Sequence, residues 1–265
     1  MPLAGAWRAI FLGSAGLAAV AGLMLFAGAA ETDRFFSWTI EPPMTAAFLG
    51  ATYWAVMLLF ASAARTTRWP AARVAAWPEA LAATLLLVAT LVHLDKFHDD
   101  LYGYFWVVVY ALAAPGLVLM VWLSERLAGR RRGPGGPPVP APLRVLLGLH
   151  AAAFAGFGAA LFVAPESTEW PWALTPLTGR ALASFLLGFG LAAALAVRQN
   201  RLSALRGAAG TYALLGALEL LAAAIHSDDF TTDLGLALFA GFFGTVLAAG
   251  LWGLAASRRA HTTNT

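Results

Sequence analysis

The sequence predicts an all-α, multi-pass membrane protein whose eight transmembrane helices form two parallel four-helix repeats. Sixty per cent of the 265 residues are hydrophobic and only 12% are charged, whereas soluble domains carry roughly twice that share of charge. Several apolar runs reach the ~20 residues that cross the hydrocarbon core of a bilayer. A polar pattern, H-x-D-x-F-x-x-D-L, occurs twice, 133 residues apart, beginning at His93 and at His226.

The apolar runs are expected to be helices, because a helix satisfies its backbone hydrogen bonds internally within lipid. We expect spans at residues 9–30, 44–64, 75–94, 103–124, 143–164, 177–197, 208–226 and 233–256. The first span, which follows Arg8, also resembles a secretory signal peptide. We expect it to be retained, since three of its residues recur in the fifth span (Gly22, Leu25 and Phe26 match Gly158, Leu161 and Phe162).

The basic residues predict the orientation of the spans. Fourteen of the seventeen lie at the chain ends or in the connections that follow the second, fourth and sixth spans. The positive-inside rule makes that side cytoplasmic. Both termini are therefore expected on the cytoplasmic side of the inner (plasma) membrane. Eleven of the fourteen acidic residues lie on the opposite, outer side. Trp38, Trp170 and Trp172 lie in the same outer loops, where tryptophan commonly anchors a protein at the membrane interface.

A linker divides the chain into two halves. Residues 133–142 are almost entirely glycine and proline, a composition that cannot hold a helix, and we expect a mobile cytoplasmic segment. Residues 1–132 and 143–265 are the two repeats. A constant offset of 133 residues matches polar as well as apolar positions, such as Arg65 with Arg198, which indicates a duplication. Each repeat has an even number of spans, which predicts a pseudo-two-fold axis along the membrane normal.

The repeated polar stretch is the first candidate site. His93 and His226 follow the third and seventh spans, and Asp95 and Asp228 lie two residues further on. If those spans flank the pseudo-axis, the four side chains form a site for zinc or another divalent metal, or exchange protons near neutral pH. The structural alternative is that each histidine closes a helix C-terminus, where the helix dipole favours a cation.

Other polar residues are assigned from their positions in the spans. Glu219 lies within the seventh span and His150 within the fifth, and they either pair with each other or form separate helix–helix hydrogen bonds. Asp100 and Asp233 directly precede the fourth and eighth spans, as helix N-caps do. The first half is expected to be short of polar residues at mid-membrane depth, with Pro115 as the only proline that breaks a span.

Three functions remain open. The repeats, the outer polar stretch and Glu219 favour a transporter or permease-like protein for a cation or small solute. The alternatives are a non-catalytic scaffold or accessory subunit of a larger membrane complex, and a haem or metal protein with His93, His226 or His150 as ligands. An enzyme that acts on lipid or on an exported substrate, with the His/Asp pairs as acid and base, ranks last. The chain has no cysteine and no Walker, Rossmann, H-E-x-x-H or G-x-S-x-G motif. The expected partners are the bilayer, other membrane subunits or a second copy, and not nucleic acid.

Overall fold

A computed structural model describes residues 4–66, 68–128 and 136–262, and over these residues the fold is entirely helical. Eight of the helices are long and apolar enough to cross a membrane. They are α1 (Ala4–Ala27), α3 (Pro43–Ala63), α4 (Trp69–Val92), α5 (Leu101–Ala128), α6 (Ala141–Val163), α7 (Pro176–Gln199), α8 (Leu202–Ile225) and α9 (Asp233–Thr262). The predicted all-α class and the eight spans are confirmed, and the chain is an integral, multi-pass membrane protein.

Short helical turns occupy three of the connections. They are the 3₁₀ turn Ala29–Glu31 with the adjoining α2 (Thr32–Phe35), and the 3₁₀ turns Leu94–Lys96 and Ser227–Asp229. The last two turns lie within the two copies of the repeated polar stretch. Each begins directly after the histidine that ends the preceding span, and each carries the aspartate of the pattern.

Polar caps start several of the long helices. Asp100 caps α5 as predicted, because its carboxylate accepts a hydrogen bond from the amide of Gly103 at 2.9 Å. The prediction for Asp233 is wrong. Asp233 is the first residue of α9, and the Thr232 hydroxyl accepts the bond from the Gly235 amide at 3.0 Å. A hydroxyl one position earlier thus serves the free amides of the first turn.

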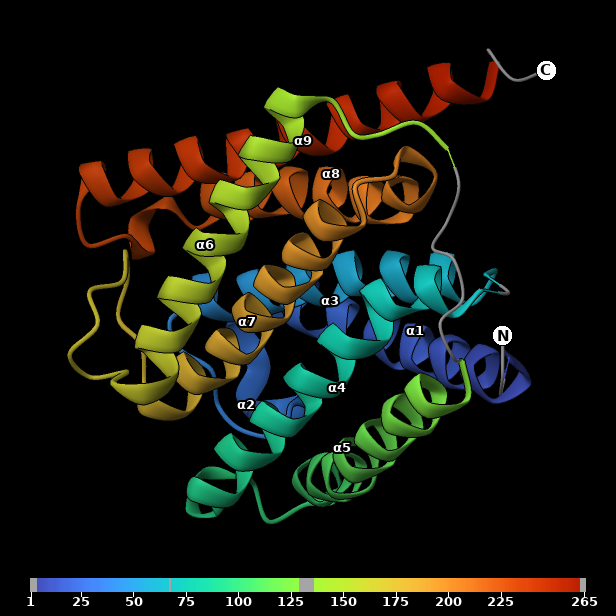
Figure 1. Cartoon of the computed structure of the whole chain (residues 1–265). Helices are drawn as coiled ribbons and strands as arrows, with labels where there is room; N and C mark the ends of the chain where they lie inside the picture. Colours follow the sequence, from blue (N-terminus) through green and yellow to red (C-terminus); the bar gives the residue numbers. More distant parts are fainter. Residues whose placement is uncertain (1–3, 67, 129–135, 263–265) are drawn as a thin grey trace.

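Consecutive long helices pack as pairs: α1 with α3, α4 with α5, α6 with α7, and α8 with α9 (Figure 1). Glycine allows a close approach of α1 to α3 and of α8 to α9. A Cβ added at Gly50 of α3 would lie 2.5 Å from the backbone nitrogen of Phe26 in α1, and one added at Gly250 of α9 would clash with the backbone of Ala213 in α8. Small residues therefore let these helices touch backbone to backbone.

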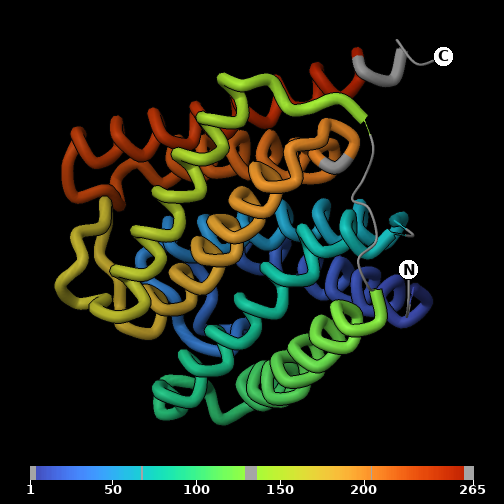
Figure 2. Tube along the Cα trace, viewed as in Figure 1, coloured from blue at the N-terminus to red at the C-terminus, as the bar shows by residue number. Residues whose placement is uncertain are grey.

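The two halves of the chain are joined through their central helices. Helix α4 packs on α7 and α3 packs on α8, which places helices distant in sequence side by side (Figures 1 and 2). The largest core cluster draws buried side chains from both halves. The spans α3 and α7 are the most buried, whereas α1, α5, α6 and α9 are largely exposed. The halves therefore share one core, and four helices form the outer surface.

The start of α1 and the end of α9 lie at one end of the bundle, here called the terminal end (Figure 1). The connections 28–42, 93–100, 164–175 and 226–232 lie at the opposite end, called the loop end (Figures 1 and 2). Every long helix runs between these two ends. The two ends correspond to the two faces that the sequence distinguishes by charge.

Part of the predicted linker is held in place at the terminal end. Residues 133–135 lie outside the described part of the chain. The amide of Val139 donates to the Asn200 side chain at 3.1 Å, and the amide of Leu202 donates to the Pro137 carbonyl at 3.0 Å. Val139 is buried. The described residues of the linker thus pack on the α7–α8 connection, contrary to the expected mobility.

Candidate functional site

A cavity lies inside the bundle among α1, α3, α4, α5 and α7, and we call it the Glu79 cavity. Its volume is about 140 Å³, close to the roughly 150 Å³ of an engineered protein cavity that binds benzene. Glu79 lies ten residues into α4, roughly 15 Å along the helix at 1.5 Å per residue, so it is near the middle of the span. The walls are apolar except for four side chains, Ser14, Tyr53, Glu79 and Tyr110.

The carboxyl group of Glu79 is only half satisfied. Its side chain is 8% exposed. The Ser14 hydroxyl of α1 donates a short hydrogen bond to Oε1, while Oε2 is buried and has no hydrogen-bond partner among the described residues. A buried polar atom without a partner is uncommon in native structures. A carboxylate at membrane depth is costly unless it is protonated or paired, so Oε2 is the natural contact for a proton or a cation.

Glu79 and Pro78 correct two expectations about the first half. Both lie inside α4, so the third span carries an ionisable residue and a second span-breaking proline beside Pro115. Proline lacks an amide hydrogen and removes one helical hydrogen bond. A Cβ added at Gly188 of α7 would lie 3.5 Å from the Pro78 carbonyl, so α7 passes close to the interrupted turn. The sequence contained this signal, since Glu79 is a carboxylate within an apolar run, as Glu219 is.

Aromatic side chains line the cavity together with Glu79. The hydroxyls of Tyr53 in α3 and Tyr110 in α5 lie 3.3 Å apart. The ring of Phe185 in α7 packs edge-on against Tyr53, with 5.0 Å between the ring centroids. Phe189, one turn further along α7, also lines the cavity. These rings provide π faces near a carboxyl group, a combination that suits a cation with an apolar body.

Aromatic clusters lie at both ends of the cavity. Toward the terminal end, Phe60 of the cavity wall stacks on Phe11, and Phe11 stacks on Trp7. The indole of Trp7 donates to the Ser124 hydroxyl at 2.7 Å, which ties α1 to α5. Toward the loop end, the ring centroid of Trp106 lies 4.5 Å from that of Tyr110. Aromatic side chains therefore flank the cavity on its terminal-end side and on its loop-end side.

A second, open hollow lies at the loop end, and we call it the loop-end vestibule. Its volume is about 630 Å³, and it is lined by residues from 29–43 and 173–175 together with Asp229 and Thr231. It carries three carboxylates, from Asp33, Glu41 and Asp229. No basic residue lies among the lining residues of the vestibule. Its local potential is therefore negative, which concentrates cations.

Two helices connect the vestibule to the cavity. Pro43 of α3 lines the vestibule and Tyr53 lines the cavity, ten residues or roughly 15 Å apart along the helix. Helix α7 runs the same way, from Thr175 at its N-cap to Phe185. Between these levels the side chains of Leu49 and Leu182 are buried. The route along α3 and α7 is closed by apolar packing in this conformation.

The predicted histidine–aspartate corners occupy the C-terminal caps of α4 and α8. Arg180 of α7 donates to Nε2 of His93 at 2.8 Å, and Asp95 pairs with Lys96 at 2.9 Å. In the described part of the chain, the side chains of His226 and Asp228 form no hydrogen bond. No group of three or more His, Cys, Asp or Glu residues that would hold a metal ion occurs among the described residues. The four-residue metal site stays a prediction.

The electrostatics of the first corner follow from these contacts. Burial lowers the pKa of His93 below its usual value of 6.5, and the Arg180 guanidinium lowers it further. The Asp95 carboxylate raises the pKa of His93, and the Lys96 ammonium lowers it. The hydrogen bond from Lys96 lowers the pKa of the Asp95 carboxyl. Arg180 has only hydrogen-bond donors, so it requires a neutral His93 ring that accepts through Nε2.

The intramembrane residues Glu219 and His150 do not pair with each other. Glu219 of α8 is fully buried and accepts a long hydrogen bond, 3.5 Å, from the Thr52 hydroxyl of α3. The Nε2 atom of His150 bonds the hydroxyl of Thr245 in α9 at 2.9 Å. Oε2 of Glu219 and Nδ1 of His150 have no partner among the described residues. Each residue thus links a different pair of helices.

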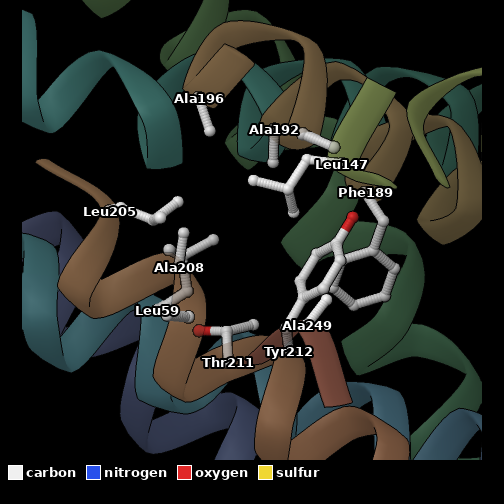
Figure 3. Close-up of a pocket in the computed structure, with 12 residues that line it drawn as sticks. Leu59, Leu147, Phe189, Ala192, Ala196, Leu205, Ala208, Thr211, Tyr212 and Ala249 are labelled. Atoms are coloured by element: carbon white, nitrogen blue, oxygen red, sulfur yellow. The ribbon is translucent and has the colours of Figure 1, made fainter. Parts of the chain in front are cut away.

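A much smaller cavity, of about 20 Å³, lies among α3, α6, α7, α8 and α9 (Figure 3). It is lined by Tyr212, which stands 133 residues after Glu79 in the sequence. Figure 3 shows Leu147, Leu205 and Tyr212 around a common gap whose lining is almost entirely apolar. That volume holds about one water molecule. The second half therefore has a tyrosine and a small gap where the first half has a carboxyl group and a larger cavity.

The tryptophans of the loops pack inside the protein. Trp38 and Trp172 are 3% and 1% exposed, and each ring lies against a phenylalanine of a polar stretch, Phe97 and Phe230 respectively. The indole of Trp172 donates to the Thr45 hydroxyl at 2.8 Å. Trp170 is partly buried and packs on Trp172. The expected interfacial anchoring is wrong for Trp38 and Trp172, because their rings fasten the loops to the core.

Comparison with known proteins gives no family for this chain. No protein-family model matches the sequence, and neither a curated protein nor a solved structure matches it.

Proposed function

We propose that this protein is a transporter or permease-like membrane protein that moves a cation or small solute through the Glu79 cavity. The observation that carries the proposal is the buried Glu79 carboxyl group, whose Oε2 faces no hydrogen-bond partner in a cavity near mid-span. A buried carboxyl oxygen without a partner is uncommon in native structures and calls for an explanation. An ionisable group at this depth is by default a functional candidate.

The packing between the halves supports the predicted repeat architecture. If α3 corresponds to α7 and α4 to α8, one two-fold rotation exchanges the α4–α7 interface with the α3–α8 interface, and both interfaces are present. Parallel repeats of this kind have their axis along the membrane normal, and transporters commonly bind substrate where the repeats meet. The Glu79 cavity has such a position, because α4 and α7 come from different halves.

The charge distribution predicts the orientation of the protein in the membrane. The positive-inside rule places the arginine-rich terminal end in the cytoplasm and the loop end outside the inner membrane. The acidic loop-end vestibule then faces the exterior and concentrates cations at its mouth. A cation would pass from there along α3 and α7 to Glu79. The two aromatic clusters would open alternately, with Trp106 and Tyr110 on the outer side and Trp7 and Phe11 on the inner side.

A scaffold or accessory subunit is the second candidate, and one observation favours it. Cβ atoms added at Gly148 and Gly156 of α6, or at Gly241 and Gly244 of α9, would meet nothing within 4 Å. Small residues on an exposed helix face allow another transmembrane helix to approach closely. A haem or metal protein is less favoured, since Nε2 of His93 and Nε2 of His150 are already hydrogen-bonded.

Charge movement in reconstituted membranes tests the transporter proposal. Proteoliposomes on a solid-supported membrane would be exposed in turn to sodium, potassium, magnesium, ammonium, guanidinium and benzylammonium chlorides. We expect a transient current for at least one cation with the unmodified protein, and a loss of at least tenfold in Glu79→Gln. Glu166→Gln, an exposed loop variant, is the matched control. Folded protein that gives no current with any of these cations would overturn the proposal.

A further inference from the structure

We propose that the ligand of the Glu79 cavity is a small primary organic ammonium ion with a compact apolar body, rather than a metal ion. This inference rests on the proposed function and specifies its substrate class. The cavity of about 140 Å³ has the capacity for a body of about six to eight non-hydrogen atoms, judged from the benzene-sized cavity of similar volume. The ammonium group would pair with Oε2 of Glu79.

The sign of the ligand's charge follows from the lining residues. Among the described residues, Glu79 is the only acidic one that lines the cavity, and no arginine, lysine or histidine of that part of the chain lines it. Ser14 already donates to Oε1, so one carboxylate oxygen remains for the ligand. In a low-dielectric site this carboxylate is stable only with a proton or a cation beside it. An anionic ligand would meet no basic group to neutralise it.

The shortage of oxygen atoms argues against a metal ion. Calcium takes six to eight oxygen ligands, and magnesium requires an octahedral set. The side-chain oxygens of this cavity come from Ser14, Tyr53, Glu79 and Tyr110 alone, and the described residues contain no cluster of acids and histidines that would hold a metal. A metal ion would lose its water without receiving an equivalent set of ligands. An organic ammonium ion needs only a few acceptors.

The remaining walls suit an apolar body. Phe185, Phe189 and Leu86 line the cavity with valine, leucine and alanine side chains of five helices. Phe185, Tyr53 and Tyr110 line the cavity, and aromatic rings of this kind attract cations. The tyrosine hydroxyls can accept hydrogen bonds from the remaining N–H groups of the ligand. Apolar surface transferred from water to this cavity contributes to binding. The corresponding gap around Tyr212, at about 20 Å³, has no room for such a ligand, so one site per chain is expected.

Isothermal titration calorimetry tests the inference. The full chain in mild detergent is titrated with benzylammonium chloride to measure the binding affinity. Benzyl alcohol, which has nearly the same shape but no charge, is the comparison ligand. We expect one saturable site for benzylammonium and an affinity at least tenfold lower for benzyl alcohol. Glu79→Gln should weaken benzylammonium binding at least tenfold. Tyr212→Phe removes the hydroxyl at the corresponding position of the second half and should leave binding unchanged.

A cavity-filling variant keeps the test interpretable if Glu79→Gln does not fold. Ala82→Leu adds volume at the cavity wall and leaves the carboxyl in place, and it should also abolish benzylammonium binding. Equal affinity for the two ligands, or benzylammonium binding that survives both variants, would overturn the inference. Current with inorganic cations alone, without benzylammonium binding, would overturn the inference and leave the transporter proposal standing. Glu79-dependent binding without any current would support the ligand class and overturn transport.

Discussion

Arg180 of α7 donates a hydrogen bond to Nε2 of His93, at the C-terminal cap of α4, across 2.8 Å. The same guanidinium donates through Nε to the Phe162 carbonyl at the end of α6, at 3.1 Å. One side chain therefore fastens the loop ends of three helices, and two of them, α4 and α7, line the Glu79 cavity. This contact joins the two halves of the chain at the level where the vestibule begins.

Acidification should weaken this contact. In the folded protein the pKa of His93 lies below its usual 6.5, because burial and the Arg180 guanidinium both lower it. Asp95 raises the pKa of His93, and Lys96 lowers it further. Below pH 6.5 the unfolded chain takes up a proton at this position that the folded protein resists, so stability falls as the pH decreases from about 6.5. We expect the melting temperature in detergent to fall between pH 7 and pH 5.5, and His93→Gln to reduce that fall.

His226→Gln is the matched control for this measurement, because its ring forms no hydrogen bond in the described part of the chain. An identical pH dependence of melting in the unmodified protein and in His93→Gln would contradict the prediction.

Replacing Glu79 with leucine should stabilise the protein while removing its activity. The substitution removes a buried carboxyl oxygen that has no partner, a feature that costs on the order of 1–3 kcal/mol. Leucine also fits the apolar walls of the cavity. The expected result is a higher melting temperature together with loss of cation-evoked current. A lower melting temperature for Glu79→Leu would indicate that the carboxyl group serves the fold.

The close helix pairs should be sensitive to added volume at glycine. Gly50→Val should lower stability by about 1–3 kcal/mol, the usual cost of overpacking, because the new side chain meets the Phe26 backbone. Gly148→Val is the matched control, since nothing lies within 4 Å of a Cβ at that position. Detergent unfolding followed by circular dichroism would compare the two variants. Equal stability of both would show that α1 and α3 separate without cost.

Asp229, in the second polar stretch, should stabilise the start of a helix in the other half of the chain. Oδ2 of Asp229 accepts a hydrogen bond from the amide of Met44 in the first turn of α3, at 2.8 Å. Asp229→Ala should cost about 1 kcal/mol, as the loss of an N-cap does. Asp228→Ala, at the neighbouring exposed position, should leave the melting temperature unchanged. An equal loss of stability in both variants would show that the removal of a negative charge, and not the loss of the cap on α3, is responsible.

Much of the architecture could be predicted from the sequence because it depends on local properties. Hydrophobic length defines a span, so the eight helices, their order and the all-α class follow from composition along the chain. The N-cap at Asp100 also follows locally, since the amide it serves lies three residues away. The sequence also shows Glu79 as a carboxylate within an apolar span. Glu79 is not part of the repeated pattern, because the corresponding residue of the second half is Tyr212.

Only the tertiary structure decided which distant side chains meet. The hydrogen-bond partner of His93 is Arg180, 87 residues away, and the spacing of the two histidines does not indicate this contact. Of the two alternatives for Glu219, the separate helix–helix hydrogen bond is present, with Thr52, 167 residues away. Such contacts depend on how helices rotate and cross when their surfaces interlock, which apolar composition along one helix does not specify. The burial of a carboxyl group in the membrane follows from the sequence, because apolar residues surround Glu79 along its span. Its position in the wall of a cavity follows from the packing of five helices.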